Sequence, residues 1–320
     1  MHQDTVLYNL GVDISKYRSG IMGLSMIAII LFHQHFIGGF PTGIFHQCGY
    51  WGVDIFLLLS GMGMVNSLKK NTLCGFYKRR FLRLIPTCMF CGTLKNLILF
   101  LMGDNLVEYR FNVLSLFGMD LWFIRAIICY YAISPILFNT LRKRPILALT
   151  VISIIYFING IFFRVHDAES FTWIIERLFV FSFGMYLSLH SSYVNRNTIM
   201  ISSLSLCIAL GIVITEGRPL TNAILWTIMM YAVALGSLSI LIVGALFCKC
   251  CKDNILVFFD LFGKLSLELY LFHEFFFYWG RYYFSARISP FFLFIICLLL
   301  CIMLSLLCQK VISCITSFRK

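Results

Sequence analysis

Long apolar runs recur along the whole chain, and they constrain its fold more than any other feature. Most of them are about 17–25 residues long, which is the length that an α-helix needs to cross a bilayer. Of the 320 residues, 60% are hydrophobic and only 12% are charged, whereas a water-soluble protein of this size needs a more polar surface. We therefore expect an all-α polytopic membrane protein with about ten transmembrane helices.

The hydropathy of the chain predicts where these helices lie. The expected spans cover residues 20–40, 52–68, 81–102, 121–139, 145–163, 177–191, 198–215, 222–247, 254–279 and 290–314. No segment between them is long enough to form a core of its own, so we expect a single transmembrane domain over residues 1–320 and no soluble domain. The polar segment before the first span lacks the pattern of a cleavable signal peptide, and the first span is expected to be retained.

The basic residues alternate with the spans and indicate their orientation. With about ten spans, one side carries Lys16, Arg18, Lys69, Lys70, Lys78, Arg79, Arg80, Arg83, Arg142, Lys143, Arg144, Arg196, Lys249, Lys252, Arg319 and Lys320, and the other carries Arg110, Arg164, Arg218, Arg281 and Arg287. Cytoplasmic loops are enriched in Lys and Arg, so both termini are expected in the cytoplasm. The expected location is the plasma membrane. The net charge of +12 follows largely from this asymmetry, and it favours anionic lipids rather than nucleic acid as partners.

The thirteen cysteines do not indicate a metal site or a disulfide framework. Most lie singly inside apolar runs, where a free Cys behaves as a small hydrophobic residue. The one cluster, "CKCC" at Cys248–Cys251, lacks the spacing of zinc ligands and has no histidine nearby. We therefore expect no bound metal.

Polar side chains inside the spans point to a functional site, because exposing an ionisable group to lipid costs several kcal/mol. The predicted orientation places one group of them at similar depth, towards the outer side: His33, Asp54, Trp122, Arg125, Glu176, Arg177 and His273. For any one of them a merely structural role is the commoner reading, and Trp122 alone suits an interfacial aromatic belt. Their shared depth favours a water-accessible site that opens to the extracytoplasmic side. Lys95 and Glu268 have no evident partner in the sequence. His35 is about 200° round the helix from His33, so it points in another direction.

A second feature lies at the predicted inner face, in the stretch "FYKRRFLRLIP" (76–86). Arg79 and Arg83 are four residues apart and share one face of a helix. Guanidinium groups bind phosphate in a bidentate geometry. A plain topology signal explains the neighbouring lysines well but explains this pairing less well, so the stretch indicates an anion-binding site.

The chain resembles the acyltransferase-3 family of integral membrane acyltransferases. The segments that carry the resemblance occur in the family's order: "MGLSMIAIILFH" (22–33), "GYWGVDIFLLLSG" (49–61), "FYKRRFLRLIP" (76–86), "LWFIRAIICYYAISPIL" (121–137), "RLFVFSFGMYL" (177–187) and "LFGKLSLELYLFH" (261–273). The resemblance implies a ten-span helical fold and transfer of an acyl group, with acetyl expected, from cytoplasmic acyl-CoA. The implied acceptor is a sugar hydroxyl of an extracytoplasmic or lipid-linked glycan of the cell envelope.

The resemblance also implies roles for individual residues. His33 matches the family's first-span histidine and is implied to be catalytic, and Arg79 and Arg83 are implied to bind the donor, acyl-CoA, which is a co-substrate rather than a permanently bound cofactor. The family commonly carries an arginine eleven positions before that histidine, where this chain has Met22. Arg18, one helical turn earlier, is the expected substitute. Some members carry a fused extracellular esterase-like domain that this chain lacks, so a separate extracytoplasmic transferase is an expected partner.

These observations combine into one hypothesis for the mechanism. His33 acts as a general base on the acceptor hydroxyl or helps to form a transient acyl-enzyme, because imidazole titrates near neutral pH. Asp54 or Glu176 would orient the imidazole. The other polar residues at that depth, Trp122, Arg125, Arg177 and His273, would bind the acceptor or stabilise the oxyanion.

Two other functions remain open from the sequence. A transporter or flippase for a small or lipid-linked envelope molecule also fits about ten spans with polar residues at depth. Against it, no pair of spans broken by Gly or Pro occurs in corresponding halves of the chain. A membrane scaffold or sensor without activity is the third reading, and the departure at Met22 keeps it open.

Overall fold

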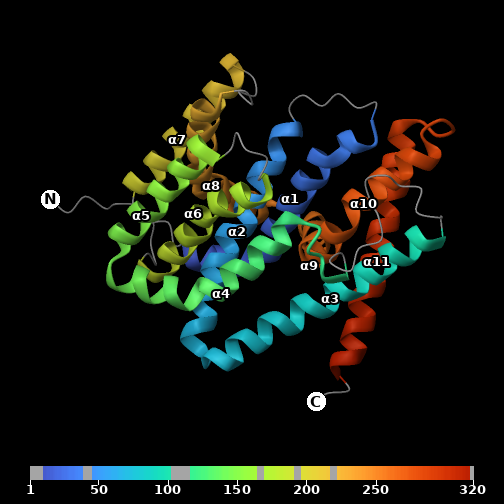
Figure 1. Cartoon of the computed structure of the whole chain (residues 1–320), viewed down its shortest axis with the longest axis horizontal. Coiled ribbons are helices and arrows are strands. Elements are labelled where there is room, and N and C mark those ends of the chain that lie inside the picture. The colour runs from blue at the N-terminus through green and yellow to red at the C-terminus, as the bar shows by residue number, and fades with distance from the viewer. Residues whose placement is uncertain are drawn as a thin grey trace.

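The computed structural model (Figure 1) describes residues 10–38, 45–101, 116–163, 169–190, 196–216 and 222–317, and over these ranges the regular elements are all helical. They are α1 (Leu10–His33), η1 (Gln34–Phe36), α2 (Phe45–Lys70), α3 (Leu73–Leu101), α4 (Trp122–Lys143), α5 (Pro145–Ile158), η3 (Asn159–Phe163), α6 (Glu169–His190), α7 (Arg196–Glu216), α8 (Ala223–Cys250), α9 (Asp253–Lys264), α10 (Ser266–Phe284) and α11 (Pro290–Ser317). Some basic residues of the topology prediction lie outside the described residues: Arg110, Arg164, Arg218, Arg319 and Lys320.

The helices confirm an all-α polytopic membrane protein. Within the described residues, nine helical segments are long and apolar enough to cross a bilayer. The ninth expected span, 254–279, is wrong as a single helix, because the chain there forms α9 and α10 with a break at Leu265. The 12 residues of α9 reach only about 18 Å, which is less than the thickness of the hydrocarbon core.

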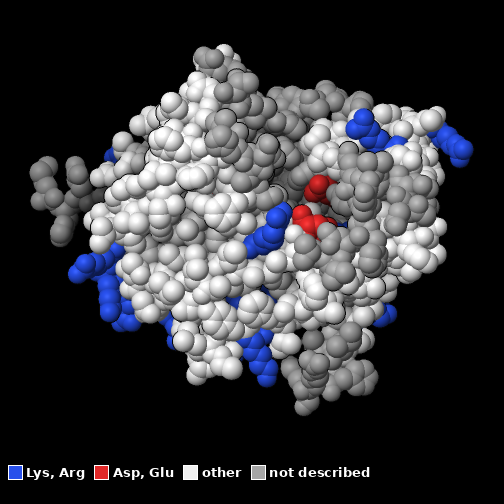
Figure 2. Space-filling model, viewed as in Figure 1, with Lys and Arg blue, Asp and Glu red and all other residues white. Residues whose placement is uncertain are grey.

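The outside of the bundle is apolar. Large hydrophobic side chains project outward from the flanking helices, for example Ile146, Ile214 and Met303. On the face shown in Figure 2, charged side chains lie mainly at the edges and around one hollow, and wide uncharged areas separate them. Such a surface suits contact with lipid tails and explains why the chain carries so few charges.

Helices α1, α2 and α6 occupy the middle of the bundle, α5 and α7 lie on one flank, and α3 and α11 cross on the other (Figure 1). Glycines allow the central helices to approach closely. A Cβ atom on Gly61 of α2 would collide with the Phe181 carbonyl oxygen of α6, and one on Gly184 of α6 would collide with the Leu58 carbonyl oxygen of α2. Small residues at such crossings let backbones meet, and this close packing stabilises helix pairs in lipid.

A second reciprocal glycine crossing joins α1 to α9. A side chain at Gly23 would meet the Phe259 carbonyl oxygen, and one at Gly263 would meet the Ser19 carbonyl oxygen. The Ser19 hydroxyl also donates a hydrogen bond to the Asp260 carbonyl oxygen over 3.2 Å. The break after α9 therefore follows a helix that is held against the backbone of α1, and α10 begins from that fixed point.

Contacts between helix ends agree with alternating passage through the membrane. The Lys249 ammonium near the end of α8 lies 3.8 Å from the Asp13 carboxylate near the start of α1. His190, at the end of α6, donates from Nε2 to the Leu141 carbonyl oxygen near the end of α4 over 2.9 Å. Alternation places the two members of each pair on the same side of the membrane. That this side is cytoplasmic stays a prediction.

Candidate active site

Two histidines that are far apart in the sequence meet in the bundle. Nδ1 of His33, the last residue of α1, lies 3.1 Å from Nε2 of His273 on α10. His33 Nδ1 also lies 2.9 Å from the Ile29 carbonyl oxygen. His273 Nδ1 lies 3.0 Å and 2.9 Å from the carbonyl oxygens of Leu269 and Tyr270. The shared depth predicted for His33 and His273 thus becomes direct contact.

The acceptors around the pair determine where the ring protons lie. A carbonyl oxygen only accepts, so Nδ1 of each histidine carries a hydrogen. Neutral His273 then has its lone pair on Nε2, and that lone pair accepts the Nδ1–H of His33. The lone pair of His33 is consequently on Nε2. His33 is half-buried and His273 is 1% exposed, so His33 is the ring that can present a base to a substrate.

Aromatic rings enclose His33. The centroids of Phe32 and Phe36 lie 4.7 Å and 5.3 Å from the centroid of its ring. Tyr50 of α2 follows at 5.4 Å from Phe32. His35, in the adjacent η1, has its Nδ1 2.7 Å from the Phe32 carbonyl oxygen. The histidine pair therefore lies against a wall of rings that limits the approach of water.

Asp54, one of the two carboxylates expected to orient His33, has another partner. Asp54 of α2 is fully buried, and its Oδ1 lies 3.0 Å from Nη1 of Arg177 on α6. Glu176 is 3% exposed. The Arg177 guanidinium lies 5.8 Å from the centroid of the Tyr50 ring. The Asp54–Arg177 pair thus connects α2 to α6 behind the aromatic wall, while the His33 imidazole is hydrogen-bonded to His273.

The residues predicted on α4 lie in its first turn. Trp122 is half-buried and packs edge-on against Trp173, with ring centroids 5.3 Å apart. Arg125 follows three residues later and is also half-buried. Between them, Phe123 packs against Tyr270 of α10 at 5.0 Å. The start of α4 therefore lies beside α10 close to the turn that carries His273.

One buried ion pair was not anticipated from the sequence. Lys95 of α3 is 3% exposed, and its Nζ lies 3.1 Å from Oδ2 of Asp120. The sequence reading left Lys95 without a partner. The available signal was that Asp120 directly precedes the span 121–139, at the depth where α3 is expected to end.

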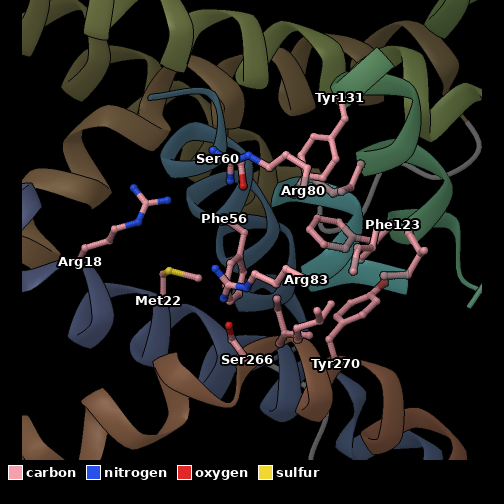
Figure 3. Close-up of a pocket in the computed structure, with 15 residues that line it drawn as sticks. Arg18, Met22, Phe56, Ser60, Arg80, Arg83, Phe123, Tyr131, Ser266 and Tyr270 are labelled. Atoms are coloured by element: carbon pink, nitrogen blue, oxygen red, sulfur yellow. The ribbon is translucent and has the colours of Figure 1, made fainter. Parts of the chain in front are cut away.

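A cavity lined by arginines lies between α1, α2, α3, α4 and α10 (Figure 3). Its volume of about 130 Å³ exceeds the space of a single water molecule several-fold. The side chains of Arg18, Arg80 and Arg83 line it, and Figure 3 shows their guanidinium groups directed towards the space around Phe56 and Ser60. None of the described residues that line it is acidic. A partly enclosed space with three guanidinium groups and no carboxylate is suited to an anion.

Backbone carbonyl groups of α2 hold two of these arginines in place. Nη2 of Arg18 donates to the Leu59 carbonyl oxygen over 3.0 Å, and Nη2 of Arg80 donates to the Gly63 carbonyl oxygen over 3.2 Å. The two carbonyl groups are one helical turn apart, so the guanidinium groups are fixed side by side along α2. This arrangement keeps their remaining N–H groups available to a ligand.

The arginine facing the cavity with Arg83 is Arg80 and not Arg79. Arg79 is exposed and lines a neighbouring open groove together with Lys70 and Asn71, and Arg80 borders both spaces. Spacings of three and of four residues both place side chains on one helix face. The prediction from the sequence used only the spacing of four residues and so missed Arg80 as a residue of the cavity.

The arginine cavity reaches towards the histidine pair. Ile29 and Tyr270 both line it, and their carbonyl groups accept the Nδ1–H groups of His33 and His273. Met22 lines the same cavity as Arg18. The end of the cavity lined by Ile29 therefore lies about one helical turn from the base, and the arginines lie further along the cavity.

The membrane-spanning bundle places a histidine pair beside an arginine-lined cavity, an arrangement suited to a membrane enzyme that acts on an anionic ligand. The acyltransferase domain family matches residues 20–310, and the chain belongs to this acyltransferase-3 family. It is therefore a multi-pass membrane acyltransferase, as its motifs predicted. No curated protein and no solved structure gives a significant match.

Proposed function

We propose that the protein transfers an acyl group, with acetyl expected, from cytoplasmic acyl-CoA to a sugar hydroxyl of an extracytoplasmic or lipid-linked glycan of the cell envelope. The observation that carries the proposal is the arginine cavity, which has no acidic residue among its described lining and ends one helical turn from His33. A donor that carries phosphates at one end and a thioester at the other fits this combination. The plasma membrane and the sugar acceptor are expected from the family resemblance, and the charge asymmetry supports the cytoplasmic side for the donor.

The donor phosphates bind Arg18, Arg80 and Arg83 in this scheme. The neighbouring groove with Lys70 and Arg79 supplies a second cationic surface for the nucleotide end of the donor. Arg18 takes the role of the family arginine that is missing at Met22. This assignment is supported because the two side chains line the same cavity.

The transfer step uses the lone pair on Nε2 of His33. Nε2 removes the proton from the acceptor hydroxyl while the hydroxyl oxygen attacks the thioester carbonyl carbon. The carbon–sulfur bond then breaks, and the proton passes from His33 to the leaving thiolate, so that the products are the acyl ester and free CoA. Trp122 and Arg125 are the proposed contacts of the acceptor. Asp54, Arg177 and Glu176 support the wall behind the base rather than acting on it.

The test is acyl transfer by the purified protein in nanodiscs, with radiolabelled acetyl-CoA and a panel of envelope glycans. The wild type is expected to label one acceptor class, and His33→Ala is expected to lose at least ~100-fold of that rate, because general-base catalysis contributes on this scale. His35→Ala is the matched control and should retain most of the activity. Equal transfer by the wild type and His33→Ala would remove His33 from the chemistry. A folded protein without affinity for CoA would contradict the donor assignment.

A further inference from the structure

Both ring nitrogens of His273 are engaged within the protein. Its Nδ1–H is shared between two carbonyl oxygens of its own helix, those of Leu269 and Tyr270, and its Nε2 faces His33. The side chain is 1% exposed. It therefore has no free nitrogen with which to bind the sugar acceptor or stabilise the oxyanion, the roles that the sequence predicted for it. What it offers is one fixed lone pair aimed at His33.

The lone pair on Nε2 of His273 accepts the only N–H hydrogen of neutral His33. The contact spans 3.1 Å, and the Ile29 carbonyl oxygen accepts the same hydrogen at 2.9 Å. Two acceptors on different helices thus orient the His33 ring about its side-chain torsions. Ile29 belongs to the same helix as His33, so it cannot relate the ring to the rest of the bundle. His273 can, because it is carried by α10.

The charge of the pair changes when His33 acts. Once Nε2 of His33 takes the hydroxyl proton, the ring carries a positive charge and its Nδ1–H becomes a stronger donor. A hydrogen bond from a charged donor is shorter and roughly twice as strong as a neutral one. The neutral acceptor at Nε2 of His273 therefore stabilises the protonated form of His33 more than the resting form.

We propose that His273 is a positioning residue, which accepts the Nδ1–H of His33, aims Nε2 of His33 at the acceptor hydroxyl and stabilises the imidazolium formed during transfer. The inference rests on the proposed function of His33 as the base. In this proposal the neutral imidazole of His273 orients His33, in place of the carboxylate of Asp54 or Glu176 that the sequence predicted.

The test compares His273→Leu with His273→Gln in nanodiscs. Leucine removes the hydrogen-bond acceptor and keeps the site buried. Glutamine restores a hydrogen-bond acceptor, its side-chain oxygen, close to the position of Nε2. We expect His273→Leu to lower kcat roughly 10- to 100-fold, with the KM for acyl-CoA changed by less than about 3-fold. His273→Gln should recover kcat to within about 5-fold of the wild type. His190→Gln, which also removes an imidazole-to-carbonyl hydrogen bond but at the other end of the bundle, is the matched control.

A spectroscopic readout separates positioning from folding. In protein labelled with ¹⁵N at histidine, a coupling across the hydrogen bond should join Nδ1 of His33 to Nε2 of His273 in the wild type and disappear in His273→Gln. The proposal is overturned if His273→Leu keeps the wild-type kcat, if glutamine fails to rescue it, or if only the KM for the acceptor rises. Failure of the proposed function is distinct, because His33→Ala would then retain transfer whatever His273 does.

Discussion

Single arginines in α3 differ in what they face although they lie within one helical turn and a half. Arg80 is held by the Gly63 carbonyl oxygen and lines the cavity, and Arg83 lines it as well. Arg79 lines the neighbouring open groove. The rotation of α3 about its own axis, relative to α2, determines which of these arginines face the cavity. At this scale the donor site is thus made by how a helix is rotated and not by the number of basic residues that it carries.

Arg18 is expected to contribute directly to donor affinity. Replacing it by methionine in Arg18→Met removes one guanidinium from the cavity, and hydrogen bonds to charged groups are worth about 1.5–3 kcal/mol. The dissociation constant for acyl-CoA should therefore rise at least ~10-fold, because about 1.4 kcal/mol corresponds to tenfold in affinity. Calorimetric titration of CoA into the purified protein measures this. Lys16→Met, an exposed charge on the same helix, is the control, and equal affinity in the two variants would exclude Arg18 from the donor site.

Asp54 is expected to matter for stability more than for chemistry. Asp54→Ala leaves the buried Arg177 guanidinium without its carboxylate, and an unpaired buried charge costs about 3–5 kcal/mol. The double variant Asp54→Leu with Arg177→Met removes both charges and should recover most of the thermal midpoint. Thermal unfolding in detergent, followed by intrinsic fluorescence, compares the three proteins. A single variant as stable as the double variant would mean that the pair does not connect α2 to α6.

At the scale of helices, the crossing of α2 with α6 depends on two glycines. Each of them faces a carbonyl group of the other helix so closely that no Cβ atom fits. The two backbones together carry the Asp54–Arg177 pair, so this crossing also holds the wall behind His33. The geometry of the site therefore depends on helix packing some distance from the reacting atoms.

Alanine at these glycines tests the crossing. Gly61→Ala and Gly184→Ala are expected to lower the thermal midpoint and the folded yield, because the added methyl group forces α2 and α6 apart. Gly211→Ala in α7 is the control, since a Cβ there meets nothing within 4 Å. In that position alanine should be neutral or stabilising by up to about 1 kcal/mol through its higher helix propensity. Three variants with the same midpoint would contradict the close approach.

The sequence predicted the helices better than it predicted their contacts. Hydropathy reports how well a segment tolerates lipid, so it located most spans but treated the run 254–279 as continuous and missed the break at Leu265. It also gave the depth of His33 and His273, because depth follows from position within a span. It did not indicate that the two rings touch, nor that Asp54 pairs with Arg177, because those contacts depend on the rotation and order of helices far apart in the chain.

At the scale of the whole molecule, the predicted orientation places both termini in the cytoplasm and can be tested by labelling. Cysteines introduced in Thr72→Cys and Ser289→Cys lie in exposed connections, between α2 and α3 and between α10 and α11. In a background without other exposed cysteines, a membrane-impermeant maleimide added to intact cells should label only the cysteine at position 289. The cysteine at position 72 should react only after the membrane is permeabilised. The reverse pattern would invert the topology and with it the side from which the donor enters.

The separation of 240 residues between His33 and His273 has a consequence for biosynthesis. At a synthesis rate of about 5–20 residues per second, roughly 12–48 s pass between the ribosome adding the first histidine and adding the second. For most of that interval the nascent chain carries all three cavity arginines, but it lacks α10, which completes the cavity and carries the residue that positions the base. If His273 acts as we propose, chains that are still being translated, or that terminate early, lack both a complete donor cavity and a positioned base, and turnover begins only when insertion is almost finished.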